Sequence, residues 1–401
     1  MSEPFAFDGE RAYQHTAALC YPRRVGTRLE RRAARYILRA FAALGMQWRR
    51  ERFRVSHLPT ALGSRVAFVL SGTLILLAAL TVEVHPLLAA LAFALAGFLV
   101  VSPWRVGFSI GESWPPLFTS HNVIASPPTP VSAAPARVIF MAHYDTKSQL
   151  IPTGVRVALV FAVAILSNGL AVYALAAALG YPGLLGDNFT DATAILAQLC
   201  LAVLVANYSG NRSPGALDNG SAVGTLLELA RSWQPKPSAP LDVLWVASGS
   251  EETGLNGARC FLARHGHLWK EKPTLLINLE SVGAGPRLYL AGESAALKLA
   301  QATADALGMP HHRLRVVGAG MDHEPFAARN LPSVTILGDV VRASWAMHTT
   351  RDNLELIERP PMERAARLAA HLAWNWADLH RPPTVPAHEE PVLPSVFPAI
   401  P

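Results

Sequence analysis

Histidines and carboxylates stand where several short hydrophobic segments of this 401-residue chain end. Taken singly, such residues are ordinary; Asp218, for example, precedes an apolar run and could simply cap a helix. A whole set at the ends of successive elements is a much less common coincidence, and imidazole and carboxylate are ligands that zinc accepts. The sequence therefore predicts a metal centre with five candidate ligands: His143, Asp218, Glu252, Glu280 and His348.

The charge balance extends this prediction to two metal ions. Three carboxylates and one bound hydroxide would neutralise two zinc ions, and two ions about 3.5–4 Å apart need one shared carboxylate. Asp145, two residues after His143, is well placed to orient that imidazole ring. Glu251 and Glu252 are adjacent and should point in different directions. If Glu252 binds a metal ion, Glu251 is available as a general base.

The segments that must position these residues alternate between strand and helix patterns. Runs rich in β-branched and aromatic residues predict strands at 46–55, 121–125, 136–142, 241–247, 274–279 and 333–337. Amphipathic patterns predict helices at 27–44, 221–233, 257–265, 293–307 and 362–379. This alternation predicts an α/β fold, a three-layer sandwich around a central mixed, mostly parallel sheet. Functional groups in such sheets gather at the carboxyl ends of the strands.

The composition is too apolar for an entirely soluble protein: 51% of the residues are hydrophobic and only 16% are charged. It also excludes disorder, and three widely spaced cysteines exclude a disulfide framework. The apolar residues concentrate in two blocks, 61–103 and 153–207. Each block contains two apolar runs joined by a short polar link, and a spanning helix needs about 20 residues. We therefore expect two transmembrane helical hairpins; the alternative is two pairs of buried core helices. The four runs are 66–82, 87–101, 157–179 and 192–206, of which the second and fourth are short.

The distribution of charge predicts the orientation of these helices. The connections 83–86 and 180–191 contain no lysine or arginine, whereas residues 1–65 contain 13 arginines. Because basic residues stay on the cytoplasmic side, we expect an integral protein of a bacterial inner membrane, with four helices and the rest of the chain in the cytoplasm. The arginines of 28–39 suit solvent and anionic lipid, so we expect the bilayer as a partner and no nucleic acid.

Six segments, taken in order, resemble the co-catalytic zinc aminopeptidases, metallopeptidase family twenty-eight. They are MAHYDT, ALDNGSAV, SEETGLNG, INLESVG, MDHEPF and MHTTRDNLE, accompanied by PRRVGT near the start. The resemblance covers nearly all of the sequence outside the apolar blocks. It implies a zinc exopeptidase-like fold with membrane insertions, and two Zn²⁺ ions or another divalent metal as cofactors. The implied discontinuous peptidase domain comprises 1–60, 104–152 and 208–381, followed by a proline-rich disordered tail at 382–401.

The resemblance also implies roles for individual residues. Asp218 would bridge both metal ions, with His143 and Glu280 completing one site and Glu252 and His348 completing the other. In addition, Glu251 would be the general base and Asp322 would lie near the substrate pocket.

Two departures from the family pattern matter. Position 280 is usually Asp in this family and is Glu here, a change that could shift one metal ion. The second apolar block also lies between His143 and Asp218, whose equivalents are usually close in sequence. Because this block leaves the ligand-bearing edge of the sheet, we expect the site near the membrane surface and apolar or membrane-derived peptides as substrates.

The predicted activity is hydrolysis of peptide bonds near a free N-terminus by a metal-activated water, with Glu251 as base. One alternative is a glutaminyl cyclase-like acyltransferase with a single zinc ion, because those enzymes share the scaffold and the HYD motif; a carboxylate at position 280 favours two metals instead. A second alternative is a non-enzymatic membrane scaffold with a retired peptidase domain. The presence of every ligand and of the base argues against it.

Overall fold

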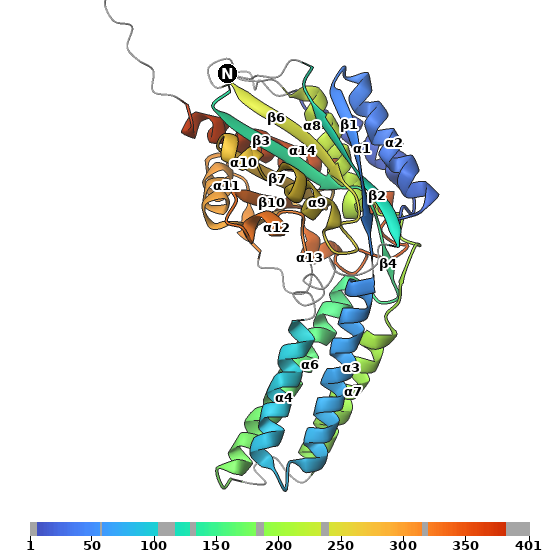
Figure 1. Ribbon diagram of the computed structural model, residues 1–401, viewed down its shortest axis with the longest axis vertical. Coiled ribbons are helices and arrows are strands. Elements are labelled where there is room, and N and C mark those ends of the chain that lie inside the picture. The colour runs from blue at the N-terminus through green and yellow to red at the C-terminus, as the bar shows by residue number, and fades with distance from the viewer. Residues whose placement is uncertain are drawn as a thin grey trace, which may run out of the picture.

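The computed structural model describes residues 6–56, 58–102, 117–128, 134–181, 188–233, 240–314 and 320–381. It consists of an α/β domain and an elongated bundle of helices that projects from one end of that domain (Figure 1). The predicted disordered tail at 382–401 lies outside the described residues, as does the middle half of the polar connection at 180–191.

The domain is built on one mixed sheet of eight strands in the order β1-β2-β6-β3-β7-β10-β8-β9. The four central strands β6, β3, β7 and β10 are parallel neighbours, whereas β1, β2 and β8 pair antiparallel with strands beside them. The mixed, mostly parallel sheet is therefore confirmed. The strands are β1 (Gln47–Val55), β2 (Phe118–Ser126), β3 (Ala136–His143), β6 (Leu241–Ser248), β7 (Thr274–Glu280), β8 (Leu288–Gly292), β9 (His311–Arg313) and β10 (Ser333–Leu337).

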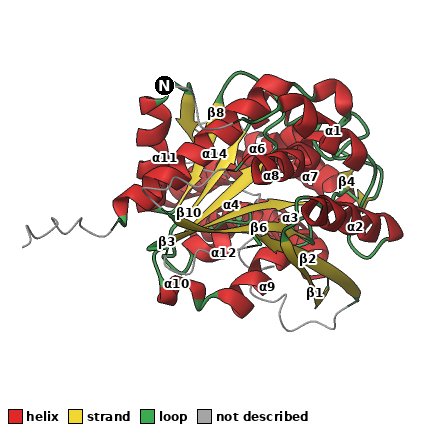
Figure 2. Cartoon of the chain, turned by 90° about the horizontal axis from the view of Figure 1, so that it is seen from above, coloured by secondary structure: helices red, strands yellow, loops and turns green. Residues whose placement is uncertain are grey.

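Helices cover both faces of this sheet (Figure 2). The longer helices of the domain are α1 (Gly9–Leu19), α2 (Arg28–Ala43), α8 (Ala222–Ser232), α9 (Asn256–His265), α11 (Ser294–Ala306) and α14 (Arg359–Leu379). Shorter elements are α10 (Leu268–Glu271), α12 (Glu324–Ala327), α13 (Val340–Ala343), the π-helical segment η2 (Ala216–Ser221) and the 3₁₀ turn η3 (Leu354–Leu356). A two-stranded ribbon, β4 (Ser148–Gln149) with β5 (Ser209–Gly210), lies beside the bundle.

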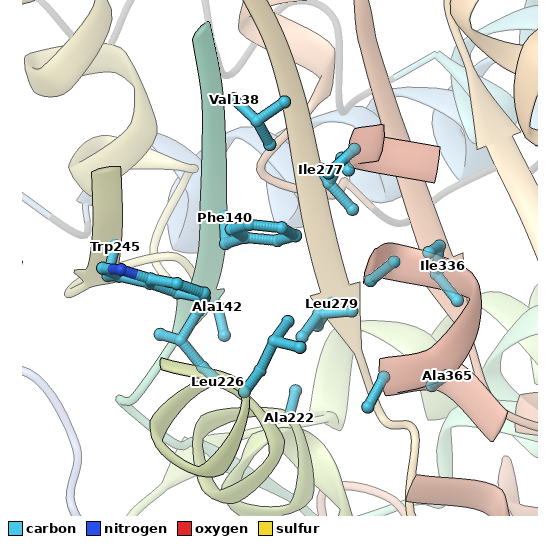
Figure 3. Packing of buried hydrophobic residues seen from close by; sticks show 14 of the residues in the cluster. Val138, Phe140, Ala142, Ala222, Leu226, Trp245, Ile277, Leu279, Ile336 and Ala365 are labelled. Carbon is cyan, nitrogen blue, oxygen red and sulfur yellow. The ribbon is translucent and has the colours of Figure 1, made fainter. Parts of the chain in front are cut away.

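Strand β3 shows why the sheet needs helices on both sides. Successive side chains of a strand point to opposite faces, and every residue of β3 is buried. Phe140 packs on one face against Trp245 and the helix α8 (Figure 3), with the two rings stacked 4.6 Å apart. Met141, on the other face, belongs to a second cluster with Phe261 of α9. A strand buried on both faces is typical of the centre of a parallel sheet.

The apolar blocks form four helices that pack around one another. They are α3 (Leu58–Thr81), α4 (Pro86–Val101), α6 (Thr153–Ala178) and α7 (Phe189–Ala206). α3 packs against α4 and α7, and α6 packs against the same two helices, so the bundle is closed. Its interior is apolar, and Phe93 and Leu170 are fully buried there. Its outer surface is apolar as well, since Leu80 and Ile165 are 74% and 70% exposed.

Three of these helices are long and apolar enough to cross a membrane: Leu62–Thr81, Thr153–Ala178 and Phe189–Ala206. The fourth, Pro86–Val101, has 16 residues and is shorter than a usual span. The helix α6 begins at Thr153, four residues before the apolar run that the sequence indicates at 157–179. Its first turn contacts the α/β domain, where the N–H of Gly154 donates to the carbonyl of Ser344.

Candidate metal centre

The five candidate ligands converge at the end of the sheet. Two groups of three have ligand atoms that all lie within 4.8 Å of one another, and Asp218 belongs to both groups. The side chains are at most 10% exposed. The first triad is His143, Asp218 and Glu280, and the second is Asp218, Glu252 and His348.

The carboxylate of Asp218 lies between the two histidines. Its Oδ1 is 3.2 Å from Nε2 of His143, and its Oδ2 is 2.9 Å from Nε2 of His348. The same His143 nitrogen is 3.1 Å from Oε1 of Glu280, and that of His348 is 3.2 Å from Oε1 of Glu252. One carboxylate with an oxygen facing each triad is the arrangement that a bridging ligand requires.

Parallel strands explain most of this convergence. His143 ends β3 and Glu280 ends β7, and these two strands are parallel neighbours, so their last residues meet at one edge of the sheet. Glu252 follows β6, which pairs with β3 on its other side. Asp218 lies in η2, ahead of α8, and His348 lies in the loop after α13.

The acidic character of the site fits divalent metal ions. Burial raises the pKa of Glu280 and raises that of Glu251 well above its ordinary range, although His143 acts against both shifts. Lys147 Nζ lies 2.6 Å from Oε2 of Glu252. This lysine offsets the charge of Glu252 but not that of the other carboxylates. Several buried carboxylates this close together require further positive charge. Carboxylate and imidazole donors in two triads fit a pair of zinc-like ions.

The histidines supply positive charge when no metal is bound. Burial alone lowers the pKa of His143, but Glu280 and Glu251 raise it well above its ordinary value. Burial alone raises the pKa of Asp218, but hydrogen bonds from His143 and His348 lower it well below the usual range. The pKa of Glu252 falls to about 2, because His348 and Lys147 outweigh burial. Metal binding at these groups therefore displaces protons.

Asp145 contacts His143 and also the backbone of the two adjacent glutamates, Glu251 and Glu252. The ring nitrogen Nδ1 of His143 lies 3.2 Å from the backbone oxygen of Asp145 and 3.7 Å from its carboxylate. The carboxylate itself accepts hydrogen bonds from the backbone N–H groups of Glu251, at 3.0 Å, and Glu252, at 3.3 Å. The sequence indicated Asp145 as a partner of the histidine ring but not its contact with the two glutamates.

Glu251 and Asp322 border the cluster without belonging to either triad. Oε2 of Glu251 is 3.7 Å from Nε2 of His143. Asp322 is fully buried, accepts a hydrogen bond from the hydroxyl of Ser248, and has its pKa raised to about 7, chiefly by burial. Both carboxyl groups are therefore held in a dry environment in which they can bind a proton.

Two residues missed by the sequence analysis hold the segment that carries Asp218. The carboxylate of Asp352 accepts the backbone N–H of Leu217 at 2.6 Å and that of Asp218 at 3.2 Å. The buried guanidinium of Arg23 donates to the carbonyl groups of Pro214 and Gly215. Both residues lie in segments that carried the family resemblance, RDNLE and PRRVGT, which is the signal that could have identified them.

Comparisons with known proteins agree with this geometry. The model of peptidase family M28 matches residues 191–373, which include four of the five candidate ligands. Aminopeptidase YwaD of Bacillus subtilis is 29% identical over 168 residues, which is 39% of this chain and 36% of that protein. The vacuolar membrane protease of Schizosaccharomyces japonicus is 30% identical over 149 residues, 35% of this chain and 17% of that protein. The chain thus spans about a third or less of these curated relatives.

Solved structures show the same fold. BSAP, a zinc aminopeptidase from Bacillus subtilis, superposes with a TM-score of 0.55 at 16% identity, covering 92% of this chain and 95% of that one. The glutaminyl cyclase of Porphyromonas gingivalis superposes with a TM-score of 0.50 at 17% identity, covering 93% and 98%. The architecture is that of the α/β zinc aminopeptidase fold. The family match over residues 191–373 and the two donor triads both make the chain similar to peptidase family M28.

Proposed function

We propose that this protein is a membrane-anchored, zinc-dependent aminopeptidase that hydrolyses peptide bonds next to a free N-terminus. The observation that carries this proposal is the pair of donor triads that share Asp218, with the carboxylate of Glu251 beside them. The names of family relatives, an aminopeptidase and a protease, support the same class of reaction.

The two triads assign the ligands of a metal pair. His143 and Glu280 would hold one ion, Glu252 and His348 the other, and Asp218 would bridge them. Such a pair, when bound, polarises a carbonyl group and lowers the pKa of water to about 7.

Glu251 is the proposed general base. It is buried, it lies next to the triads, and its raised pKa suits a group that accepts a proton from water and then delivers it to the leaving amine. Asp145 supports this role because its carboxylate holds the backbone N–H of Glu251. Asp322, behind Ser248, is the proposed substrate-pocket residue.

Two complete triads favour hydrolysis over the single-zinc cyclase reaction. The fold similarity includes glutaminyl cyclases as well as aminopeptidases, so it does not discriminate between them. The donor set favours the aminopeptidase reaction, because Glu280 and Glu252 each complete a separate triad. A retired scaffold would have no need to keep both triads and Glu251 buried together.

The helical bundle is the proposed membrane anchor. Residues 61–103 and 153–207 would form two hairpins, with four helices in the bilayer and the catalytic domain in the cytoplasm. The exposed apolar outer face of the bundle supports this arrangement. So do four apolar residues that lie in α13 or close to the ends of α6, α7 and α13, and that suit the interface between lipid and water. These are Leu150, Tyr208, Val341 and Trp345, all more than half exposed.

Apolar or membrane-derived peptides are the proposed substrates. The first turn of α6 contacts the loop that carries His348, so the anchor and the donor cluster are adjacent. A site at the lipid surface would receive apolar chains more readily than polar ones. Equal turnover of a soluble polar peptide and of an apolar peptide presented in vesicles would contradict this part of the proposal.

Metal content and product analysis test the proposed function together. We expect the protein purified in detergent to bind two zinc ions per chain and to release free amino acids from unblocked peptides but not from acetylated ones. A single zinc ion with formation of pyroglutamate from an N-terminal glutamine would establish the cyclase activity instead. Absence of bound metal after incubation with zinc would establish the scaffold alternative.

A further inference from the structure

The first residue of the apolar helix α6 contacts the candidate ligand His348. Oγ1 of Thr153 lies 2.9 Å from Nδ1 of the imidazole ring. The other ring nitrogen, Nε2, faces the carboxylates of Asp218 and Glu252. The helix that leaves the domain to join the bundle therefore begins with a side chain directed at the site.

Two backbone hydrogen bonds join α6 and the strand β4 just before it to the same loop. The N–H of Gly154 donates to the carbonyl of Ser344 at 3.1 Å, and that of Gln149 donates to the carbonyl of His348 at 2.8 Å. A Cβ atom added to Gly154 would come within 2.9 Å of the Ser344 hydroxyl oxygen, so the two segments approach closely. In Figure 1 the bundle meets the domain at the edge where α13 and β4 lie. The position of α6 and that of His348 are thereby linked.

The chemistry of imidazole gives this contact a direction. If Nε2 uses its lone pair to bind a metal ion, the ring proton resides on Nδ1 and is donated to the Thr153 hydroxyl. Such an outer hydrogen bond selects the tautomer and fixes the plane of the ring. His143 has a different partner for the same purpose, the backbone oxygen of Asp145. The two histidines of the cluster are therefore oriented by different parts of the fold.

We propose that Thr153 is a positioning residue for His348, and that the apolar helix α6 is thereby a structural part of the metal centre. The inference rests on the proposed function in one respect, namely that His348 is a metal ligand. It adds that the block inserted between His143 and Asp218 does more than anchor the domain: it supplies the group that orients one ligand of the second triad.

Three variants of the full-length protein test this proposal. Thr153→Val keeps the shape of the side chain but removes the hydroxyl, and Thr153→Ser retains it. The control is Thr73→Val in α3, where an exposed threonine hydroxyl donates to the carbonyl of Val69 in its own helix. Zinc affinity is measured in detergent by competition with a coloured chelator, and the visible spectrum of the cobalt-substituted protein reports the geometry of the donors.

We expect Thr153→Val to weaken one of the two zinc sites by about 10–100-fold, the usual effect of losing an outer-shell partner. The other site and the thermal unfolding midpoint should change little, the cobalt spectrum should shift, and Thr153→Ser and Thr73→Val should resemble the wild type. Two unchanged sites in Thr153→Val, or equal weakening of both with a lower unfolding midpoint, would overturn the proposal. A wild-type protein that binds no zinc would instead refute the proposed function, and this inference with it.

Discussion

At the scale of single residues, the candidate site divides its carboxylates into those that face the histidines and one that stands apart. Asp218, Glu252 and Glu280 each lie within 3.2 Å of a histidine nitrogen, whereas Glu251 is 3.7 Å from His143 and belongs to neither triad. Residues of the first kind should determine metal content. Glu251 should determine the rate of turnover and leave the metal content unchanged.

Replacing Glu251 with alanine should separate these two functions. We expect peptide hydrolysis to fall by about 10²–10⁴-fold, the usual contribution of a general base, while the zinc content stays at the wild-type value. The measurements are the initial rate of amino acid release and the metal content of the same preparation. The exposed residue Glu355 provides the control, since Glu355→Ala should alter neither quantity. Turnover close to wild type in Glu251→Ala would eliminate this residue as the base.

At the scale of elements, the site depends on side chains that join one segment to another. Arg23 is fully buried and donates to the carbonyl groups of Tyr144, directly after β3, and of Pro214 and Gly215, directly before η2. It thus connects the segment that carries His143 with the one that carries Asp218. A planar guanidinium can reach several acceptors at once, which an ammonium group cannot.

Substituting Arg23 by lysine should therefore destabilise the domain. Each buried carbonyl left without a donor costs about 1–3 kcal/mol, so we expect the thermal unfolding midpoint to fall by several degrees and zinc binding to weaken. The neighbouring Arg24→Lys, at a half-buried position, is the matched control and should leave both unchanged. Equal midpoints for the two variants would show that the carbonyl contacts contribute little.

The helix α2 contains a group whose protonation should affect stability. Thr27 caps the helix by accepting the N–H of Glu30, and the buried carboxyl of Glu30 accepts the N–H of Gly26 and the hydroxyl of Ser120. Burial raises the pKa of Glu30 to about 8, above the value of 4.5 in an unfolded chain. The folded protein binds this proton more tightly, so the resulting stability is full below pH 4.5 and is lost as the pH rises through 8.

We expect the wild-type unfolding midpoint to fall more steeply between pH 6 and 9 than that of Glu30→Gln. Glutamine keeps an oxygen that can accept the N–H of Gly26, presents an N–H₂ group to Ser120 in place of the protonated carboxyl, and does not titrate. The measurement is the difference between the two proteins across this pH range, because other groups titrate in both. Parallel curves would mean that Glu30 is ionised in the folded protein throughout the range.

At the scale of the whole molecule, the domain and the bundle meet beside the candidate metal centre. α6 begins at the loop that carries His348, and the far end of the bundle contains the connection between α3 and α4 (Figure 1). Val84 in this connection is 73% exposed, and Asp305 of α11, in the α/β domain, is 75% exposed. If the bundle spans a bilayer, these two positions lie on opposite sides of it.

Cysteine labelling can test this arrangement. In a background with Cys20, Cys200 and Cys260 replaced by alanine, a membrane-impermeant maleimide added to intact cells should label Val84→Cys and not Asp305→Cys. Inverted membrane vesicles should give the reverse. Labelling of both positions from the same side would show that the helices do not carry the chain across the membrane in the proposed way.

The central elements were predictable because their burial leaves a strong pattern. Strands such as β3 and β7 are buried on both faces and appear in the sequence as continuous apolar runs. β8 and β9 were missed, since they are short strands of five and three residues at the edge of the sheet. α1 was missed as well, because only a narrow face of this mainly polar helix is buried.

The sequence by itself determined the types of the candidate ligands, their order along the chain and the positions of the two apolar blocks. These follow from local composition and from elements whose ends meet at one edge of a parallel sheet. Only the tertiary structure decided that Asp218 faces both histidines, that the Asp145 carboxylate holds the two glutamates, and that Thr153 contacts His348, 195 residues away. Such contacts depend on the relative placement of distant segments to within an ångström, which no local pattern of residues specifies.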